Sequence, residues 1–305
     1  MKKENLVLGF FVGLIILNIL AWNAVFNSFQ AFLLKMVFFD VGQGDSIFIE
    51  TPQKHQILID GGPDSKILEK LAQQMPFYDK SIDLIILTHP EKDHLVGLID
   101  ILKHYQVNYV LWTGIVRDSQ EYQEWIKIIK DEQNQGAQIK IGKSGQKIFA
   151  GDAEIFILYP FENLQGQKFE DSNNTSIVAK LNFGNNSFLF TGDIYDSAEK
   201  DLIREYSCSN SPVPYQNEVS GLGCIFVSNV IKVAHHGSKT STNQEFVEKV
   251  LPQIAVIQCG KDNPYGHPHQ QTLETLNNYD VKILRTDELG DIKIISDGYS
   301  LRITN

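Results

Sequence analysis

The sequence predicts an α/β fold in which two mixed sheets pack face to face and helices cover their outer surfaces. Short apolar runs of strand character occur at both ends of each half of the chain, and segments with helical periodicity lie between them. The chain has 305 residues, of which 43% are hydrophobic and 21% are charged. This composition is that of a globular protein with a sizeable core.

In the first half, expected strands alternate with amphipathic helices. Residues 84–87 are four apolar residues in a row, as in a strand buried on both faces. Residues 95–105 place Leu95, Leu98 and Leu102 on one helical face. The expected strands are 36–40, 46–50, 56–60, 84–87 and 107–112, and the expected helices are 65–74, 95–105 and 119–133.

The second half shows the same kinds of pattern. A hairpin is expected around the turn at residues 184–186, and its second strand leads to Thr191-Gly-Asp193. The expected strands are 139–141, 147–149, 153–159, 176–183, 187–191, 227–234, 254–259, 281–285, 291–296 and 300–303, and the expected helices are 197–206, 243–250 and 272–279.

The amino terminus predicts a membrane segment. Residues 6–26 are an uncharged stretch of 21 residues, long enough as a helix to span the roughly 30 Å of a bilayer core. The lysines before it would stay on the cytoplasmic side. A cleaved signal peptide is the alternative, although residues 24–26 match a cleavage site poorly. We expect a transmembrane anchor (or signal segment) over residues 1–33 and an extracytoplasmic domain over residues 34–305.

Charge and cysteine content narrow the classes of function. The formal net charge of −10 argues against a broad basic surface, so nucleic-acid binding would need a local groove or bound metal ions. None of the three cysteines is in a CxxC spacing, which excludes a cysteine metal framework. Cys208 and Cys224 flank a stretch rich in serine, proline and glycine; a disulfide between them and two unpaired thiols both remain open.

The segment Leu84-Ile-Ile-Leu-Thr-His-Pro-Glu-Lys-Asp-His94 carries the main functional signal. A buried strand runs directly into His89, Asp93 and His94. These side chains are therefore expected at the carboxyl edge of a sheet, where open α/β sheets bind ligands. Imidazole and carboxylate groups suit zinc or manganese, and a hydrolytic site leaves a coordination position open for water.

Further potential ligands follow other expected strands. Six of the eight histidines fall into three clusters, and Asp60 and Asp193 also stand at strand ends. A structural role would give histidines no preference for such positions. The sequence therefore predicts a site for one or two divalent ions. The histidine clusters are His89/His94, His235/His236 and His267/His269.

These motifs resemble the metallo-β-lactamase superfamily, whose fold is an αββα four-layer sandwich with a one- or two-metal site. Within it, the pattern is similar to the hydrolase domain of the ComEC family of bacterial DNA-uptake proteins, over about residues 35–303. The motifs that carry this resemblance are Asp40-Val-Gly-Gln-Gly-Asp-Ser46, Leu58-Ile-Asp-Gly-Gly62, Thr88-His-x-x-x-Asp-His94, Asn173-Asn-Thr-Ser-Ile177, Thr191-Gly-Asp193, Ala234-His-His-Gly-Ser238 and Asn263-Pro-Tyr-Gly-His-Pro-His269.

The resemblance implies a set of metal ligands. His89 would bind a first ion, Asp93 and His94 a second, and Asp193 would bridge the two. Glu91 stands where the superfamily often has another histidine, and a carboxylate there would favour harder ions such as manganese. His235 and His236 would supply the next ligand position, with His236 favoured for metal binding or proton donation.

The resemblance also implies catalytic and supporting roles. The catalytic groups would be Asp93, His236 and His267, with His267 as general acid beside the leaving group. Asp60 is expected to orient the loop of His89 and His94 rather than to touch metal, and His269 to support His267. An asparagine occupies a position where the superfamily has a histidine. The expected supporting residues are Asp60, Asn174, Ser238 and His269.

The function implied by the resemblance is that of a membrane-anchored phosphodiesterase or nuclease, acting by attack of metal-bound hydroxide on DNA. Single- or double-stranded DNA would be the substrate, the membrane would be engaged through residues 6–26, and a DNA-uptake channel would be a partner. A lactonase, thioesterase or β-lactam hydrolase of the same fold is one alternative. An inactive anchored domain that binds DNA or a protein is another, which metal analysis would distinguish.

Overall fold

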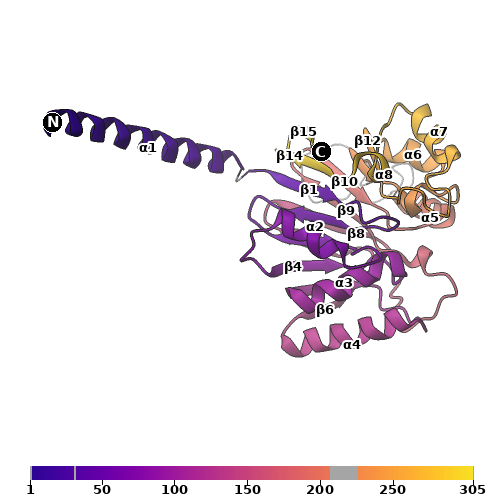
Figure 1. The fold of residues 1–305 in the computed structure, drawn as a ribbon. Helices are drawn as coiled ribbons and strands as arrows, with labels where there is room; N and C mark the ends of the chain where they lie inside the picture. The colour runs from indigo at the N-terminus through magenta and orange to yellow at the C-terminus, as the bar shows by residue number, and fades with distance from the viewer. Residues whose placement is uncertain (1, 31, 207–225, 305) are drawn as a thin grey trace.

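Two mixed sheets pack face to face to form the body of the molecule (Figure 1). The computed structural model describes residues 2–30, 32–206 and 226–304, with side chains in the first segment described for residues 7–22. The eight-stranded sheet has the order β15-β14-β1-β2-β3-β4-β5-β6, and the seven-stranded sheet has the order β13-β12-β11-β10-β9-β8-β7.

The strands are β1 (Leu34–Phe38), β2 (Ile47–Glu50), β3 (Gln56–Ile59), β4 (Ser81–Ile86), β5 (Gln106–Trp112), β6 (Gln138–Ile141), β7 (Lys147–Ala150), β8 (Ala153–Tyr159), β9 (Val178–Phe183), β10 (Asn186–Phe190), β11 (Val230–Lys232), β12 (Ile254–Ile257), β13 (Lys282–Arg285), β14 (Ile292–Ser296) and β15 (Leu301–Thr304). The helices are α1 (Lys2–Gln30), α2 (Lys66–Gln74), α3 (Lys92–His104), α4 (Gln120–Gln135), α5 (Asp196–Tyr206), α6 (Gln244–Val250), α7 (Gln270–Asn278) and α8 (Thr286–Leu289), with the short 3₁₀ turns η1 (Asn173–Thr175) and η2 (Ala234–Gly237).

Three apolar clusters define four layers. The central cluster joins the inner faces of the two sheets, for example Phe38 of β1 with Phe188 of β10. A second lies between the eight-stranded sheet and helices α2, α3 and α4, and includes Trp125. A third joins the seven-stranded sheet to α5, α6 and α7, and includes Phe246. The expected αββα sandwich is therefore confirmed.

Strand β1 shows how the sequence produces these layers. Successive side chains of a strand point to opposite faces. Met36 and Phe38 accordingly lie in the central cluster, while Val37 and Phe39 lie in the cluster beneath the helices. Both faces of this strand are buried from Met36 onward, so its second half is continuously apolar, whereas the half-buried Lys35 near its start pairs with Glu50.

The amino-terminal segment forms one helix, α1, which extends away from the sandwich (Figure 1). Its described side chains are largely apolar and exposed, including Phe10 at 67% and Trp22 at 72%. No helix among the residues whose side chains are described is both long and apolar enough to cross a bilayer.

Most expected elements form, with shifted boundaries. The helix expected from residue 95 begins at Lys92, because Glu91 has the extended backbone of an N-cap residue. This correction matters for the site, since it places Asp93 and His94 in the first helical turn. The strand expected over residues 227–234 is shorter, and α8 was not expected. Cys208 and Cys224, for which a disulfide and two unpaired thiols both remained open, lie outside the described residues.

A close contact between two glycines fixes α3 against the loop that follows β3. Gly61 donates its N–H to the carbonyl of His94 at 2.8 Å, and Gly97 donates to the carbonyl of Gly62 at 3.0 Å. A Cβ atom at Gly97 would lie 1.9 Å from the carbonyl oxygen of Gly61. The absence of a side chain at Gly97 thus allows the helix carrying His94 to approach the loop carrying Asp60.

Replacing Gly97 by alanine should therefore destabilise the protein, although alanine favours helix formation by about 1 kcal/mol over glycine. The added methyl group meets backbone atoms that cannot rotate away, so we expect a net loss of about 2 kcal/mol. Urea unfolding followed by circular dichroism measures this difference. Lys92→Ala, at an exposed position of the same helix, is the control and should change stability little. A Gly97→Ala protein as stable as the control would contradict the packing argument.

Candidate metal centre

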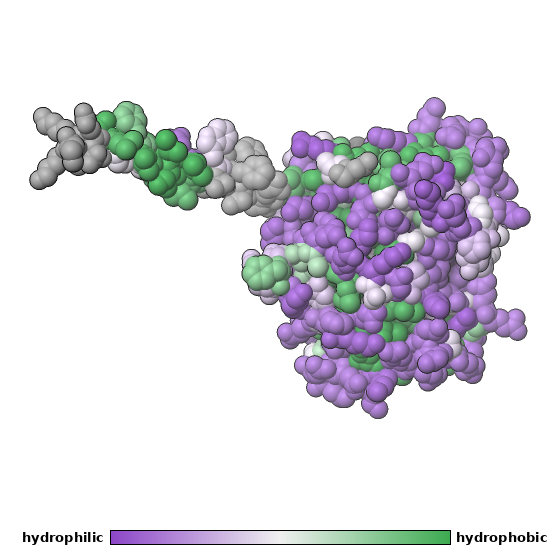
Figure 2. Space-filling model, viewed as in Figure 1, coloured by the Kyte–Doolittle hydropathy of each residue, from purple (hydrophilic) through white to green (hydrophobic). Residues whose placement is uncertain are grey.

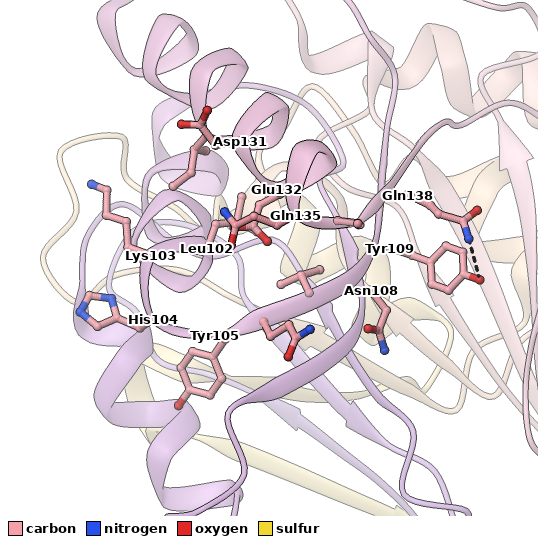
Figure 3. A pocket seen from close by; sticks show the side chains of 15 residues that line it. Leu102, Lys103, His104, Tyr105, Asn108, Tyr109, Asp131, Glu132, Gln135 and Gln138 are labelled. Atoms are coloured by element: carbon pink, nitrogen blue, oxygen red, sulfur yellow. Dashed lines mark hydrogen bonds between the residues drawn. The ribbon is translucent and has the colours of Figure 1, made fainter.

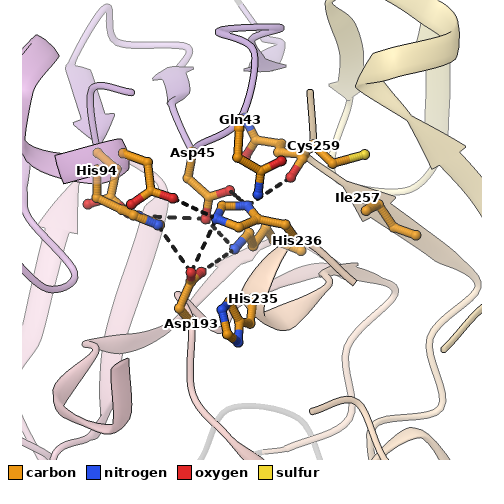
Figure 4. Close-up of polar contacts among 12 residues, drawn as sticks. Gln43, Asp45, His94, Asp193, His235, His236, Ile257 and Cys259 are labelled. Atoms are coloured by element: carbon orange, nitrogen blue, oxygen red, sulfur yellow. Dashed lines mark hydrogen bonds and ion pairs between the residues drawn. The ribbon is translucent and has the colours of Figure 1, made fainter. Parts of the chain in front are cut away.

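Several of the residues singled out in the sequence meet at the carboxyl ends of the central strands of both sheets. The loop after β3 supplies Asp60, and the segment joining β4 to α3 supplies His89 and His94. From the other sheet, Asp193 follows β10 and His236 follows β11 on the turn η2. The side chains from the two sheets point toward one another (Figure 4).

Both central histidines use one ring nitrogen for the protein and turn the other toward the cluster. Nδ1 of His94 lies 2.8 Å from the carboxylate of Asp60, and Nδ1 of His236 lies 2.9 Å from the carbonyl oxygen of Gln258. Because both partners accept hydrogen bonds, each Nδ1 carries a proton, which assigns the tautomer. When the ring is neutral, Nε2 has a free lone pair, as in a histidine that binds metal.

The Nε2 atoms face two carboxylates at separations that suit a common ion. Nε2 of His94 is 3.3 Å and Nε2 of His236 is 3.2 Å from Oδ2 of Asp193. Nε2 of His236 is also 3.2 Å from Oδ2 of Asp93. Ligands about 2.1 Å from a tetrahedral ion lie roughly 3.4 Å from one another.

His89 completes the cluster with an unpaired atom. Its Nδ1 lies 3.1 Å from the hydroxyl of Thr88, whereas its buried Nε2 has no hydrogen-bond partner in the structure. Ligand atoms of His89, His94 and Asp193 lie within 4.8 Å of one another, as do those of Asp93, His94 and His236. Burial lowers the pKa of His89 to about 3, so its ring is neutral at pH 7. The residues thus fit a divalent ion.

The facing imidazoles and carboxylates of the cluster shift one another's pKa values. Burial alone would lower the pKa of His94, but the charges of Asp193 and Asp60 raise it well above the ordinary value. The pKa of His236 is likewise raised, by Asp193 and Asp45 against the effect of burial. Burial would raise the pKa of Asp193, yet the two facing imidazoles hold it well below its ordinary range.

Asp45 and Lys232 belong to the site, although the sequence did not reveal their role. Lys232 is buried, donates to the carbonyl of Gly192 at 2.9 Å, and lies 3.2 Å from Oδ1 of Asp193. It also forms a buried ion pair with Asp45, whose other oxygen lies 3.3 Å from Nδ1 of His236. A lysine in an otherwise apolar strand was the available signal, because a buried ammonium needs carboxylate partners.

A strained turn presents the histidine pair. His235 and His236 have φ angles of +49° and +55°, a region that residues other than glycine rarely adopt. Gly237 follows with φ +82°, and a Cβ atom there would lie 2.6 Å from Cβ of Pro268. The turn is thereby held against the loop that carries His267. Strain of this kind persists where surrounding structure enforces it, as at functional sites.

His267 and His269 lie beside the cluster rather than in it. The rings of His235 and His267 are 5.5 Å apart, and those of His267 and His269 are 5.0 Å apart. Burial and neighbouring histidines lower the pKa of His267 to about 4, so it is neutral at pH 7. To act as a general acid it would need a negatively charged substrate to raise that pKa. Nδ1 of His269 accepts the N–H of Lys239 at 3.3 Å.

Glu91 and Asn174 form contacts with residues outside the cluster of potential ligands. Glu91 pairs with Arg117 at 2.7 Å and also accepts from Ser172. Asn174 donates to Ser197 at 2.8 Å and accepts the N–H of Tyr195.

His235, a predicted ligand, is absent from the groups of potential ligands found among the described residues, and Ser238 was expected only to support the site. Nε2 of His235 lies 3.4 Å from the amide of Asn173. The hydroxyl of Ser238 lies 2.9 Å from that of Thr240. Asp60 accepts hydrogen bonds from the backbone N–H and the hydroxyl of Thr88 and faces His94. It also belongs, with Asp45 and His94, to one of the groups that could hold a metal ion.

A polar hollow of about 870 Å³ lies elsewhere, between α3, α4 and the starts of β5 and β6 (Figure 3). Lys103, His104 and Glu132 are among the side chains that line it. None of the groups of potential metal ligands found in the described residues falls there. This hollow is therefore separate from the candidate centre.

Comparison with known proteins identifies the family. The model of the metallo-beta-lactamase superfamily matches residues 39–261. The chain belongs to this superfamily. A metallo-beta-lactamase fold protein from Bacillus subtilis, YhfI, superposes with a TM-score of 0.53 at 10% identity, covering 86% of this chain and 99% of that one.

Curated relatives include proteins of bacterial competence. ComE operon protein 3 of Bacillus subtilis is 30% identical over 272 residues, 83% of this chain and 32% of that protein. Competence protein ComA of Neisseria gonorrhoeae is 25% identical over 255 residues, with 83% and 31% covered. Recombination protein 2 of Haemophilus influenzae is 28% identical over 263 residues, with 84% and 28% covered. The chain spans about a third of each relative, and the expected resemblance to ComEC-type competence proteins is confirmed.

Binding of Mn²⁺ or Zn²⁺ should release protons and should tighten as the pH rises above 6.5. The raised pKa values of His94 and His236 keep both rings protonated near neutral pH in the metal-free protein, so protons compete with the ion for Nε2. Isothermal titration calorimetry in two buffers of different ionisation enthalpy measures the release. Asp93→Asn/His94→Ala should bind no ion, and the exposed-site variant His104→Ala should bind as the parent does. Affinity independent of pH would contradict the assignment.

Proposed function

We propose that this superfamily member is a metal-dependent phosphodiesterase that cleaves DNA. The observation that supports it most is a pair of ligand groups that share His94, one with His89 and Asp193 and the other with Asp93 and His236, each with its ligand atoms within 4.8 Å of one another. The Nδ1 atoms of His94 and His236 are meanwhile engaged by the protein. This donor set suits manganese or zinc. A divalent ion bound there would polarise the scissile phosphate and lower the pKa of water.

The residues around the ion would perform the remaining steps. Asp60 keeps His94 in the tautomer that binds metal, and Gln258 does the same for His236. Lys232 offsets the charge of Asp45 and Asp193. His267 faces the cluster from its edge; a phosphodiester beside it would raise its pKa and allow it to protonate the leaving oxygen.

DNA as substrate is supported by the relatives rather than by a basic surface. The proteins that match over this region are described as competence and recombination proteins. The net charge of −10 indicates that contacts with DNA are local. Because the chain spans about a third of those relatives, we also propose a DNA-uptake channel as its partner.

Cleavage of end-labelled single- and double-stranded DNA by the full chain with Mn²⁺ or Zn²⁺ tests the activity. Asp93→Asn/His94→Ala should lower the rate by about a hundredfold or more, because it removes two ligands of the ion that would stabilise the developing charge. His104→Ala, an exposed histidine that hydrogen-bonds within α3, is the matched control and should retain activity.

The same preparations should be given nitrocefin and a simple lactone. Metal binding without DNA cleavage, together with turnover of either small substrate, would refute the nuclease and favour the alternative hydrolase. Failure to bind metal would refute both and leave a binding domain.

We further propose that residues 6–26 attach the chain to a membrane, with the catalytic domain outside the cytoplasm. The support is a stretch of 21 residues without charge inside a single helix of 29 residues. The described side chains of that helix are apolar and exposed, which is costly in water.

Co-flotation with vesicles tests the attachment. The full chain should float with phosphatidylethanolamine/phosphatidylglycerol vesicles and resist extraction by high salt, because apolar burial is not screened by ions. Leu14→Lys/Leu17→Lys, which places two charges in the helix centre, should abolish flotation. Extraction of the parent by salt would contradict an apolar anchor.

A further inference from the structure

The exposed aromatic side chains of the sandwich gather on the edge from which α1 leaves. We call this the amino edge, because β1, β3, β4, β5 and β6 all begin there. Its part around the exposed rings comprises residues 32–34 and the turns at residues 51–55, 76–80, 151–152, 184–185, 251–253 and 297–300. The starts of β5 and β6, beside the polar hollow, form the rest of this edge. The candidate metal centre lies at the opposite edge.

The chain enters the sandwich next to two exposed aromatic rings. Leu34, the first residue of β1, pairs with Ser296 at the end of β14. The turn that follows β14 therefore lies beside the entry point, and its Tyr299 is 83% exposed. Phe32, just before β1, is 70% exposed.

The loop before β4 presents two further rings at the same edge. Phe77 is 87% and Tyr78 is 76% exposed, and the rings meet edge to face at 5.4 Å. The loop is tied to the start of β3, because Gln56 donates to Asp79 at 2.8 Å. These rings contact each other rather than the core.

Two turns of the seven-stranded sheet also lie at this edge. The β9–β10 hairpin is bonded to the turn after β14 through Asn185 and Gly298 at 2.6 Å. The β7–β8 turn is bonded to the β2–β3 turn through Asp152 and Gln53. Phe149, next to that turn, is 66% exposed, and Leu251, ahead of β12, is 59% exposed.

Most of the exposed large apolar side chains of the sandwich lie at the amino edge. Among the described residues outside α1, the exposed large apolar side chains away from this edge are Tyr109, Tyr265 and Leu289. Figure 2 shows hydrophobic side chains projecting from the side of the domain on which α1 leaves. Contiguous exposed apolar groups mark an interaction surface.

We propose that the amino edge rests on the lipid bilayer, with its aromatic rings at the level of the headgroups. This inference rests on the proposed attachment through residues 6–26. Tyr favours the membrane–water interface because its ring is amphipathic, and Phe side chains bury in the apolar layer just beneath the headgroups. The turns around the exposed rings carry Lys54 and Lys80 against Asp79, Asp152 and Asp297. That near balance suits a lipid surface and does not suit DNA, which requires excess positive charge.

If the amino edge rests on the bilayer, the distance between the two edges decides how a substrate reaches the metal centre. At about 3.3 Å per residue, the chain from Ser81 to His89 spans roughly 25 Å. The metal centre would therefore stand clear of the headgroups and open away from the bilayer. A long polymer could then reach the centre from the aqueous side without crossing the lipid surface.

Environment-sensitive fluorophores on the full chain test this proposal. In a Cys208→Ser/Cys224→Ser background, a single cysteine labelled with NBD would replace Phe77 or Tyr299, and Cys259 is buried. Tyr265→Cys, an exposed aromatic position at the opposite edge, is the matched control. Each protein would be placed in phosphatidylethanolamine/phosphatidylglycerol nanodiscs at one chain per disc, with lipid-borne spin labels as quenchers.

We expect emission from positions 77 and 299 to shift to shorter wavelength and to be quenched by spin-labelled headgroups, while emission from position 265 does neither. Flotation with unshifted emission at all three positions would overturn the amino-edge inference and leave the attachment intact. Absence of flotation would overturn both. A shift that appears in detergent and grows with protein concentration would show that a second copy covers the edge, and would also overturn the inference.

Discussion

The structure depends on the neutralisation of four carboxylates brought together at one buried point. Asp45, Asp60 and Asp193 come from loops and Asp93 from the first turn of α3, and the three loop residues are almost completely buried. Isolated carboxylates there would be strongly destabilising. Two imidazolium rings and the ammonium of Lys232 offset their charge in the metal-free protein. A divalent ion can replace the ring protons because the same atoms hold both.

The two edges of the sandwich differ because strand direction separates them. Five strands of the eight-stranded sheet run in the same direction. The loops that carry the potential ligands therefore lie at one edge, and turns without potential ligands lie at the other. Small residues allow the loops of the site edge to approach closely, as at Gly61 and Gly97. Close approaches also occur at the amino edge, where a Cβ atom at Gly184 would lie 2.4 Å from the carbonyl oxygen of Gly298. Exposed aromatic residues there do not interfere with the metal centre.

Glu91 and Asn173 stand where the superfamily pattern has histidines, and both form contacts with neighbouring side chains. Glu91, in place of a histidine, forms an ion pair with Arg117, which in turn donates to the carbonyl oxygens of Phe169 and Glu170. Asn173 donates to Tyr195 at 2.9 Å and faces His235. These contacts tie the segment before β9 to the mouth of the site. The positions that lack the usual ligands thus order the surrounding loops.

The sequence by itself determined the layers and the position of the site. Alternation and continuous apolar runs predicted nearly every strand, and histidines at strand ends predicted one centre, because strand periodicity and chain direction are local properties. Other features depended on contacts across the two sheets. Lys232 and Asp45 are 187 positions apart, and no local pattern shows that they pair. Strand order likewise determines three further features. These are the tautomers of His94 and His236, the pairing of Glu91, and the clustering of aromatic rings on one edge. Only tertiary structure, which sets strand order, decides them.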